Sequence, residues 1–184
     1  MPATQEEIAD TFWRLTERYG YRRTAVADVA GALRISKKTI YDFFKDKESL
    51  YRYALERWAR GQRCLVESLL TESSARGRLE QIARIAFGQS RENFRETGGP
   101  ESPESGEIVD RVNSHVFGPL IRDLIEEGIG AGEFRVSRPD LAASFCVSVG
   151  TEAVRRIRDN PKDLTEEEAL RAMLRILGVP DKED

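Results

Sequence analysis

The residues with the clearest chemical potential lie on one short stretch, residues 36–42. Its polar members are Ser36, Lys37, Lys38, Thr39, Tyr41 and Asp42. Lysine ammonium groups and the hydroxyls of serine, threonine and tyrosine suit phosphate oxygens and the edges of DNA bases. A basic stretch is more often only a solvated surface. Whether this one does chemistry therefore depends on the elements that position it.

Three helix starts are packed into residues 24–50. Thr24, Ser36 and Asp46 each precede a helical pattern, and their oxygens suit the unpaired N–H groups of a first helical turn. The apolar positions that we expect to face inward are Val26, Val29, Ala30 and Leu33 in the first helix, and Ile40, Phe43 and Phe44 in the second. Two short helices joined by a tight turn form a helix-turn-helix, whose second helix enters a DNA major groove.

Charge around this unit favours nucleic acid as the partner. Residues 22–47 carry seven basic and three acidic side chains, although the whole chain has a net charge of −3. Such an uneven distribution matters more for DNA binding than the overall charge. The remaining interpretation is a small helical subdomain with a solvated basic face.

The same stretch resembles the DNA-binding region of TetR-family transcriptional repressors. The resemblance rests on Thr24, Val29-Ala30, Ala32, Ile35-Ser36, Thr39-Ile40-Tyr41, Phe44, and Lys47-Glu48 with Leu50. It implies that Thr24, Tyr41 and Lys47 clamp the DNA backbone, while Lys37, Lys38 and Thr39 read bases or nearby phosphates. The predicted DNA-binding residues are Thr24, Ser36, Lys37, Lys38, Thr39, Tyr41 and Lys47.

Three departures from the family pattern bear on the DNA sequence that is recognised. Arg34 replaces the turn glycine, which predicts either a positive φ at a non-glycine residue or a different turn. Lys38 adds a charge where the family often has glycine. Asp42 brings a carboxylate toward phosphate, unless it accepts from a cytosine amino group or points away.

The rest of the chain predicts an all-α protein of about nine helices. Helical patterns cover residues 5–19, 47–70, 76–96, 139–158 and 166–177, and Gly118-Pro119 separates two more at 103–118 and 119–129. In the first helix we expect Phe12 and Tyr19 in the core. We place a helix-turn-helix domain at 1–46 and a ligand-binding and dimerisation domain at 47–184, with the helix at 47–70 as connector.

The last two helices each carry an apolar stripe with little chain left to cover it. Packing the pair against a second copy as a four-helix bundle would bury both stripes, and TetR-family proteins are similar in this respect. The predicted dimer interface is Leu141, Phe145, Val149, Ala153, Leu170, Met173, Leu174 and Leu177. The alternative is that both stripes pack inside one subunit.

The resemblance also implies a ligand cavity enclosed by the middle helices. Its candidate lining residues are Phe87, Ser90, Phe94, Val112, Asn113, His115, Phe117, Ile121 and Phe145. Aromatic side chains at helical spacing are more often core than pocket, so for each of these the core interpretation remains open.

Composition excludes several other functions. His115 is the only histidine, and the sequence has no metal-ligand spacing and no phosphate-cradling glycine loop. We therefore expect no metal, no cofactor and no enzymatic activity. No apolar run approaches a membrane span, and the N-terminus lacks the pattern of a secretory signal. These features predict a cytoplasmic protein whose two cysteines, Cys64 and Cys146, are reduced and buried.

The sequence thus predicts a homodimeric transcriptional regulator that binds double-stranded DNA at a palindromic operator and is released by a small-molecule effector. The rival hypothesis is a helical protein-interaction or small-molecule carrier module with a vestigial DNA-binding head. The two differ in whether the protein binds duplex DNA with the salt dependence that phosphate contacts produce.

Overall fold

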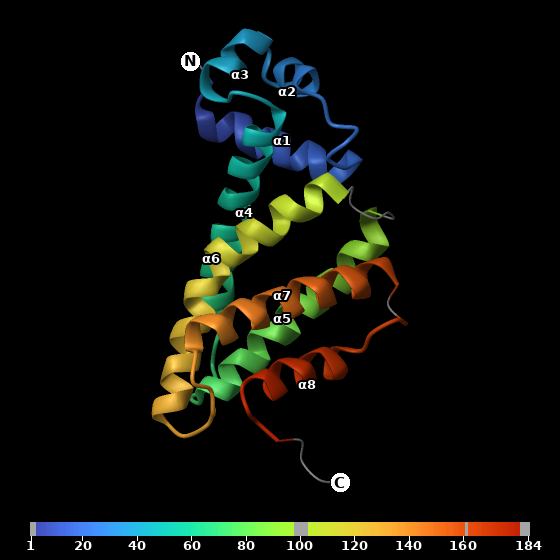
Figure 1. Ribbon diagram of the computed structural model, residues 1–184. Helices are drawn as coiled ribbons and strands as arrows, with labels where there is room; N and C mark the ends of the chain where they lie inside the picture. The colour runs from blue at the N-terminus through green and yellow to red at the C-terminus, as the bar shows by residue number, and fades with distance from the viewer. Residues whose placement is uncertain (1–2, 98–102, 161, 181–184) are drawn as a thin grey trace. The chain divides into compact units, whose positions relative to one another are not determined.

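The computed structural model describes residues 3–97, 103–160 and 162–180, with side chains placed except at 89–97, 103–105 and 158. In these ranges the chain is all-α and has no strand, as predicted (Figure 1). Its helices are α1 (Gln5–Tyr19), α2 (Val26–Leu33), α3 (Lys37–Phe43), α4 (Lys47–Leu69), α5 (Ala75–Thr97), α6 (Pro103–Gly130), α7 (Pro139–Asp159) and α8 (Glu166–Ile176). None of the helices placed here has the length and apolar character to cross a membrane.

Contacts divide the chain into two compact units. The N-terminal unit contains Met1–Gly61 and Glu101–Val112, and the C-terminal unit contains Gln62–Pro100 and Asn113–Asp184. Two helices are therefore shared, because α4 and α6 each contribute one part to either unit. The predicted division into domains at 1–46 and 47–184 remains a prediction.

The N-terminal unit forms around the inner faces of α1, α2, α3 and α4. The large side chains of its core are Ile8, Phe12, Val29, Ile40, Leu50 and Tyr51, each 0–1% exposed. Thr4 starts α1 with a reciprocal capping box to Glu7, and Gly20 ends it with a φ of 82°. Tyr19 does not join Phe12 in the core, because it is 49% exposed in the last turn of α1.

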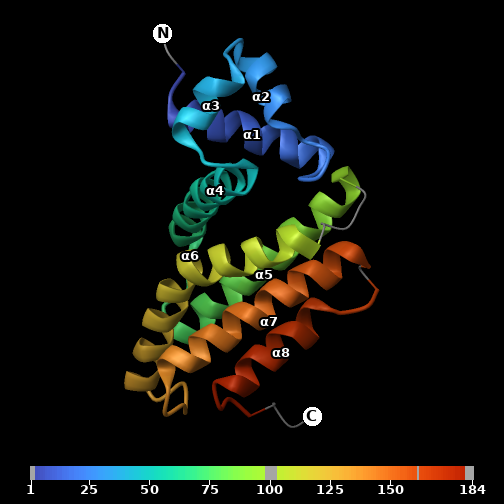
Figure 2. The same cartoon turned by 45° about the horizontal axis from the view of Figure 1, so that its top comes forward.

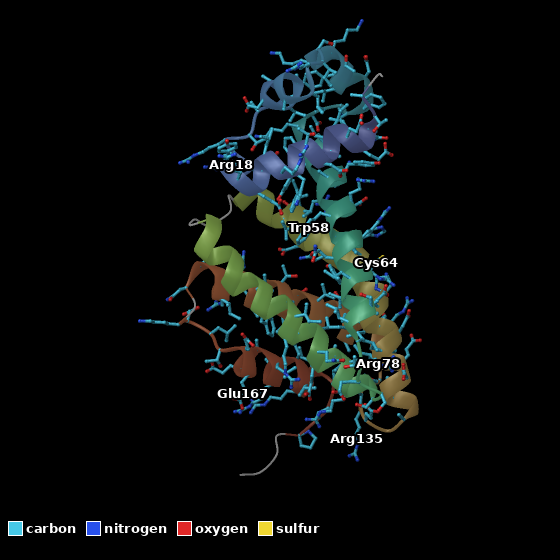
Figure 3. The ribbon with its side chains drawn as sticks, turned by 180° about the vertical axis from the view of Figure 1, so that it is seen from behind. Arg18, Trp58, Cys64, Arg78, Arg135 and Glu167 are labelled. Atoms are coloured by element: carbon cyan, nitrogen blue, oxygen red, sulfur yellow. The ribbon has the colours of Figure 1, made fainter. Side chains whose placement is uncertain are left out.

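Aromatic rings join α1 to α4 in this unit. Trp13 stacks on Trp58 with ring centroids 5.0 Å apart, and Tyr21 lies 4.4 Å from Tyr51. Figure 3 shows Trp58 on α4 beneath α1. Offset aromatic pairs at these separations each add about 0.5–1.5 kcal/mol beyond their area burial. They hold the start of α4 against α1.

The C-terminal unit is built on α5, α7 and α8, which lie side by side (Figures 1 and 2). Leu79, Phe87, Ile125, Cys146, Ile157 and Leu177 are among its most buried side chains. Thr165 and Glu168 form the predicted capping box at the start of α8. Burial raises the pKa of the Cys146 thiol to about 12. Cys64, expected to be buried, is exposed on α4 (Figure 3).

One expected break is absent, so the predicted pair of helices at 103–129 is a single helix. α6 continues through Pro119 from Pro103 to Gly130. An interior proline lacks an N–H and clashes with the preceding turn, at a cost of about 3 kcal/mol. Buried side chains on both sides, Val116 before it and Ile121, Leu124 and Ile125 after it, favour continuing the helix. Tertiary packing here outweighs local propensity.

We predict that Gly128→Ala destabilises the C-terminal unit. The buried Phe134 ring lies against Gly128, and an added Cβ would overlap it, while the Phe134 N–H donates to the Gly128 carbonyl at 3.2 Å. Overpacking of this kind costs about 1–3 kcal/mol. Gly130→Ala is the matched control on the same helix, because a Cβ there meets open space, and it should change stability by no more than about 0.5 kcal/mol. Thermal unfolding of both variants checks this, and equal shifts would contradict it.

Candidate nucleic-acid interface

Helix α3 presents its polar side chains to solvent because its apolar ones anchor it. Ile40 is 1% exposed and Phe44, which ends the helix, is 4% exposed. Ser36 caps the start as predicted, with its hydroxyl accepting from the Thr39 N–H at 3.1 Å. The hydroxyls of Ser36 and Thr39 also lie 3.0 Å apart. The exposed surface of α3 therefore consists largely of Lys37, Lys38, Tyr41, Asp42 and Phe43.

Phe43 is a correction to the sequence-based core. We expected it to face inward with Ile40 and Phe44, but it is 44% exposed. At about 100° per residue, Phe43 and Phe44 lie on opposite sides of Ile40, about 100° apart, and only the side of Phe44 is covered. The run of two phenylalanines thus contributes one core residue and one surface residue.

The turn between α2 and α3 depends on Arg34. Its backbone has φ 55° and ψ 41°, so the positive φ is observed and not the different turn that was its alternative. The Arg34 N–H donates to the Gly31 carbonyl at 3.2 Å, and the Ile35 N–H donates to the Ala30 carbonyl at 3.0 Å. These bonds end α2 and start the chain back toward α3.

We predict that Arg34→Gly stabilises the protein. The left-handed conformation costs an L-residue about 1–2 kcal/mol, and glycine avoids this cost. Glycine also loses more backbone entropy on folding, which opposes the gain by about 0.5–1 kcal/mol. The expected net gain is therefore roughly 0.5–1 kcal/mol in the free energy of unfolding. Arg34→Ala is the control, since it removes the same charge and keeps the strained φ. A gain of the same size in both variants would show that charge, not backbone strain, is responsible.

Thr24 lies inside the N-terminal unit rather than on its surface. It is 1% exposed, and both its N–H and its hydroxyl donate to the Gly20 carbonyl, at 3.2 and 3.0 Å. We expected Thr24 to cap α2, and it does not. Ala25 is the N-cap residue, and the Asp28 carboxylate accepts from the Ala25 N–H at 2.8 Å. With both donors engaged, Thr24 has no hydrogen left for a phosphate.

Lys47 is also turned toward the protein. Its Nζ donates to the Tyr21 carbonyl at 2.6 Å and to the Arg22 carbonyl at 3.4 Å, and it lies 4.3 Å from the centre of the Tyr21 ring. Burial lowers the pKa of the Lys47 ammonium, while the nearby Asp28 carboxylate acts in the opposite direction. Asp46 begins α4 as predicted, accepting from the Ser49 N–H at 2.7 Å.

Two basic residues of this surface were absent from the predicted set. Arg22 and Arg23 lie in the turn between α1 and α2, and both are exposed. The sequence signal for them was their contribution to the local positive charge. Their fixed position could not be inferred from the sequence, because it depends on the contact that Lys47 makes from α4.

The predicted ligand-pocket residues whose side chains are described differ widely in burial. Val112 and Ile121 are buried, Phe117 is half-buried, His115 is exposed, and Phe145 is 51% exposed. Asn113 donates to the Thr151 hydroxyl at 3.3 Å. Ser90 and Phe94 lie outside the described side chains. Aromatic residues at helical spacing thus mark both core and surface, and spacing alone does not distinguish them.

A groove of about 750 Å³ does lie between α5 and α8. Phe87 is the member of the predicted set that lines it, on an apolar floor shared with Ala83, Leu170, Leu174 and Val179. Its rim is charged, and the charges pair with one another: Glu80 contacts Arg76 at 2.9 Å and Arg84 at 3.0 Å, and Glu167 contacts Arg171 at 3.1 Å. Figure 3 shows Glu167 on α8.

The predicted dimer interface separates into two sets. Ala153, Met173 and Leu177 are buried within the C-terminal unit and belong to its core. This follows because α7 and α8 pack on each other and on α5. Leu141 and Phe145 remain 43% and 51% exposed, one turn apart on α7. Val149, Leu170 and Leu174 are half-buried.

A capped helix-turn-helix with an exposed basic second helix, within an all-helical chain, is the architecture of a class of DNA-binding regulators. Residues 8–54 match the family profile of bacterial regulatory proteins of the tetR family. The match confirms the resemblance of the N-terminal region to that family. A comparison with curated protein sequences finds no match.

Solved structures share the fold over almost the whole chain. RolR without ligand is 19% identical with a TM-score of 0.75, covering 96% of this chain and 91% of its own. RolR in complex with resorcinol is 20% identical with a TM-score of 0.77, covering 95% and 87%. Reduced NemR from E. coli is 17% identical with a TM-score of 0.66, covering 98% and 100%. At these identities the likeness is one of fold.

Proposed function

We propose that this TetR-family DNA-binding regulator is a homodimeric repressor, bound to a palindromic operator and released by a small-molecule effector. The observation that carries the DNA-binding part is the set of exposed side chains on α3, above all Lys37, Lys38 and Tyr41, held outward by the buried Ile40 and Phe44. Lysine and tyrosine on a short, capped helix suit phosphates and base edges in a major groove.

The homodimer is supported by Leu141 and Phe145. Large apolar side chains exposed one turn apart on α7 are suited to burial by a second copy. A two-fold dimer carries two recognition helices, which matches two half-sites of a palindrome about one or more helical turns apart.

Release by an effector is supported by the similar fold of RolR, which has been solved both without ligand and in complex with resorcinol. We place the effector site of this chain in the C-terminal unit. Release requires that the effector bind the DNA-free conformation more tightly than the DNA-bound one, since equal affinity shifts no population.

Binding to duplex DNA tests the proposal. Duplexes selected from a random pool by the purified protein, and the DNA upstream of its own gene, are measured at two salt concentrations beside a scrambled duplex. Selective binding that weakens with salt is the expected result. Absence of salt-dependent binding to every duplex would overturn the proposal and favour a protein-interaction or carrier module.

The same assay tests which side chains of α3 contact bases and which contact the DNA backbone. Lys37→Ala and Lys38→Ala should change which selected duplexes bind best, because lysines on this helix reach base edges. Tyr41→Phe should weaken binding about equally on all duplexes, because it removes a hydroxyl from a backbone contact. If the three variants behaved alike, this assignment of roles would be wrong.

A further inference from the structure

The turn that joins α1 to α2, residues 20–24, is held from several sides. Thr24 closes it by donating twice to the Gly20 carbonyl. Lys47 reaches it from the start of α4 and donates to the carbonyls of Tyr21 and Arg22. The Tyr21 ring packs 4.4 Å from the Tyr51 ring and beneath the Lys47 ammonium. Such a turn keeps its shape, and its outward side chains start from a fixed backbone.

These contacts change what Lys47 and Thr24 do. The resemblance implied that both clamp the DNA backbone, yet Thr24 is buried with its donors used and Lys47 is half-buried against two carbonyls. A hydrogen bond from a charged donor is stronger than one from a neutral donor. Withdrawing the Lys47 ammonium to meet a phosphate would forfeit the stronger bond at 2.6 Å.

Arg22 and Arg23 are the charged side chains that this turn carries outward. Both are exposed, and they directly precede α2, the first helix of the helix-turn-helix. In that motif the first helix crosses the DNA backbone while the second enters the groove. Guanidinium groups bind phosphate through two parallel N–H bonds, which makes arginine well suited to this position.

We propose that the Arg22–Arg23 turn is a phosphate-contacting element of the DNA interface, and that Lys47 and Thr24 are positioning residues that hold it. This inference rests on the proposed DNA binding. According to this proposal, the two arginines supply the phosphate contacts of the turn, which strengthen DNA binding independently of sequence and weaken with salt. Base recognition remains with α3.

The experiment measures affinity against salt for Arg22→Ala/Arg23→Ala on selected duplexes. Each lost phosphate contact reduces the slope of log affinity against log salt by about 0.9, so the double variant should lose roughly 1.8 per subunit, or about 3.6 for a bound dimer. Binding should fall about equally on all duplexes. Arg18→Ala is the matched control, since Arg18 is an exposed arginine of the preceding helical turn that lies over the Tyr19 ring. It should keep the wild-type slope.

Lys47→Met separates positioning from direct contact. It should lower affinity and also reduce the hydrogen-exchange protection of the Thr24 amide, which the arginine variants should leave intact. In the contrary outcome, Lys47→Met reduces the salt slope by one phosphate contact per subunit while the Thr24 amide keeps its hydrogen-exchange protection. That result would show that Lys47 itself binds phosphate, and it would overturn the assignment.

The two proposals fail differently. An unchanged salt slope and affinity in the double arginine variant, with wild-type binding intact, would overturn the role of the turn alone. Wild-type protein that binds no duplex in a salt-dependent way would overturn DNA binding itself and this inference with it.

Discussion

Phe44→Ala and Phe43→Ala should differ by several kcal/mol in the free energy of unfolding, although the residues are adjacent. Phe44 is 4% exposed and its ring lies 5.5 Å from that of Tyr53, so its removal leaves a cavity under α3. Large-to-small changes of this kind cost about 3–5 kcal/mol. Phe43 is 44% exposed, and surface changes stay within about 0.5 kcal/mol.

Urea unfolding of the two variants, followed by circular dichroism, measures the difference. The comparison matters for function because Phe44 anchors the helix that carries Lys37, Lys38 and Tyr41. We therefore expect Phe44→Ala to weaken DNA binding together with stability. Similar losses of stability in both variants would mean that Phe43 is buried in solution and that the exposed surface of α3 is wrongly assigned.

Phe145→Glu should convert the proposed dimer to a monomer. The side chain is 51% exposed, so the substitution leaves the core of the C-terminal unit intact. In a two-fold interface each copy would bring the same charge to the same apolar surface, where burying an unpaired carboxylate costs several kcal/mol. Loss of the second half-site contact would lower operator affinity by roughly 10²–10⁴-fold.

Light scattering after size exclusion gives the mass, and operator titration gives the affinity. Leu65→Glu is the control, because Leu65 is 46% exposed on α4, outside the proposed interface. It should keep the wild-type mass. A dimeric Phe145→Glu protein with unchanged operator affinity would place the interface on another surface.

The capping pattern was readable from the sequence where the cap is purely local. Ser36 and Asp46 bond to N–H groups three residues ahead, and the Thr165 box works in the same way. Thr24 has the same residue type, but its donors turn back to Gly20 and the helix starts one residue later. Residue type therefore identified the neighbourhood of the helix start, while competing backbone acceptors decided which residue caps it.

The uninterrupted α6 and the divided dimer stripe have a different cause. Pro119 and the apolar residues of α7 and α8 are visible in the sequence, but their outcome depends on which surfaces meet. Packing on both sides of Pro119 keeps the helix whole, and α5 covers one side of the stripe while leaving Leu141 and Phe145 exposed. A period of 3.6 residues indicates that a face is buried without indicating by what.

The sequence by itself determined the all-α class and the helix-turn-helix with its basic second helix, and it reduced the Arg34 position to two alternatives, a positive φ or a different turn. Each of these follows from local patterns: helical periodicity, capping side chains and the turn position normally held by glycine. The tertiary structure decided that Lys47 is engaged and that Phe43 is exposed, since contacts from residues distant in the chain determine whether a side chain is covered. Lys47 is the clearest case, because its partners lie 26 and 25 residues away in the turn that it holds.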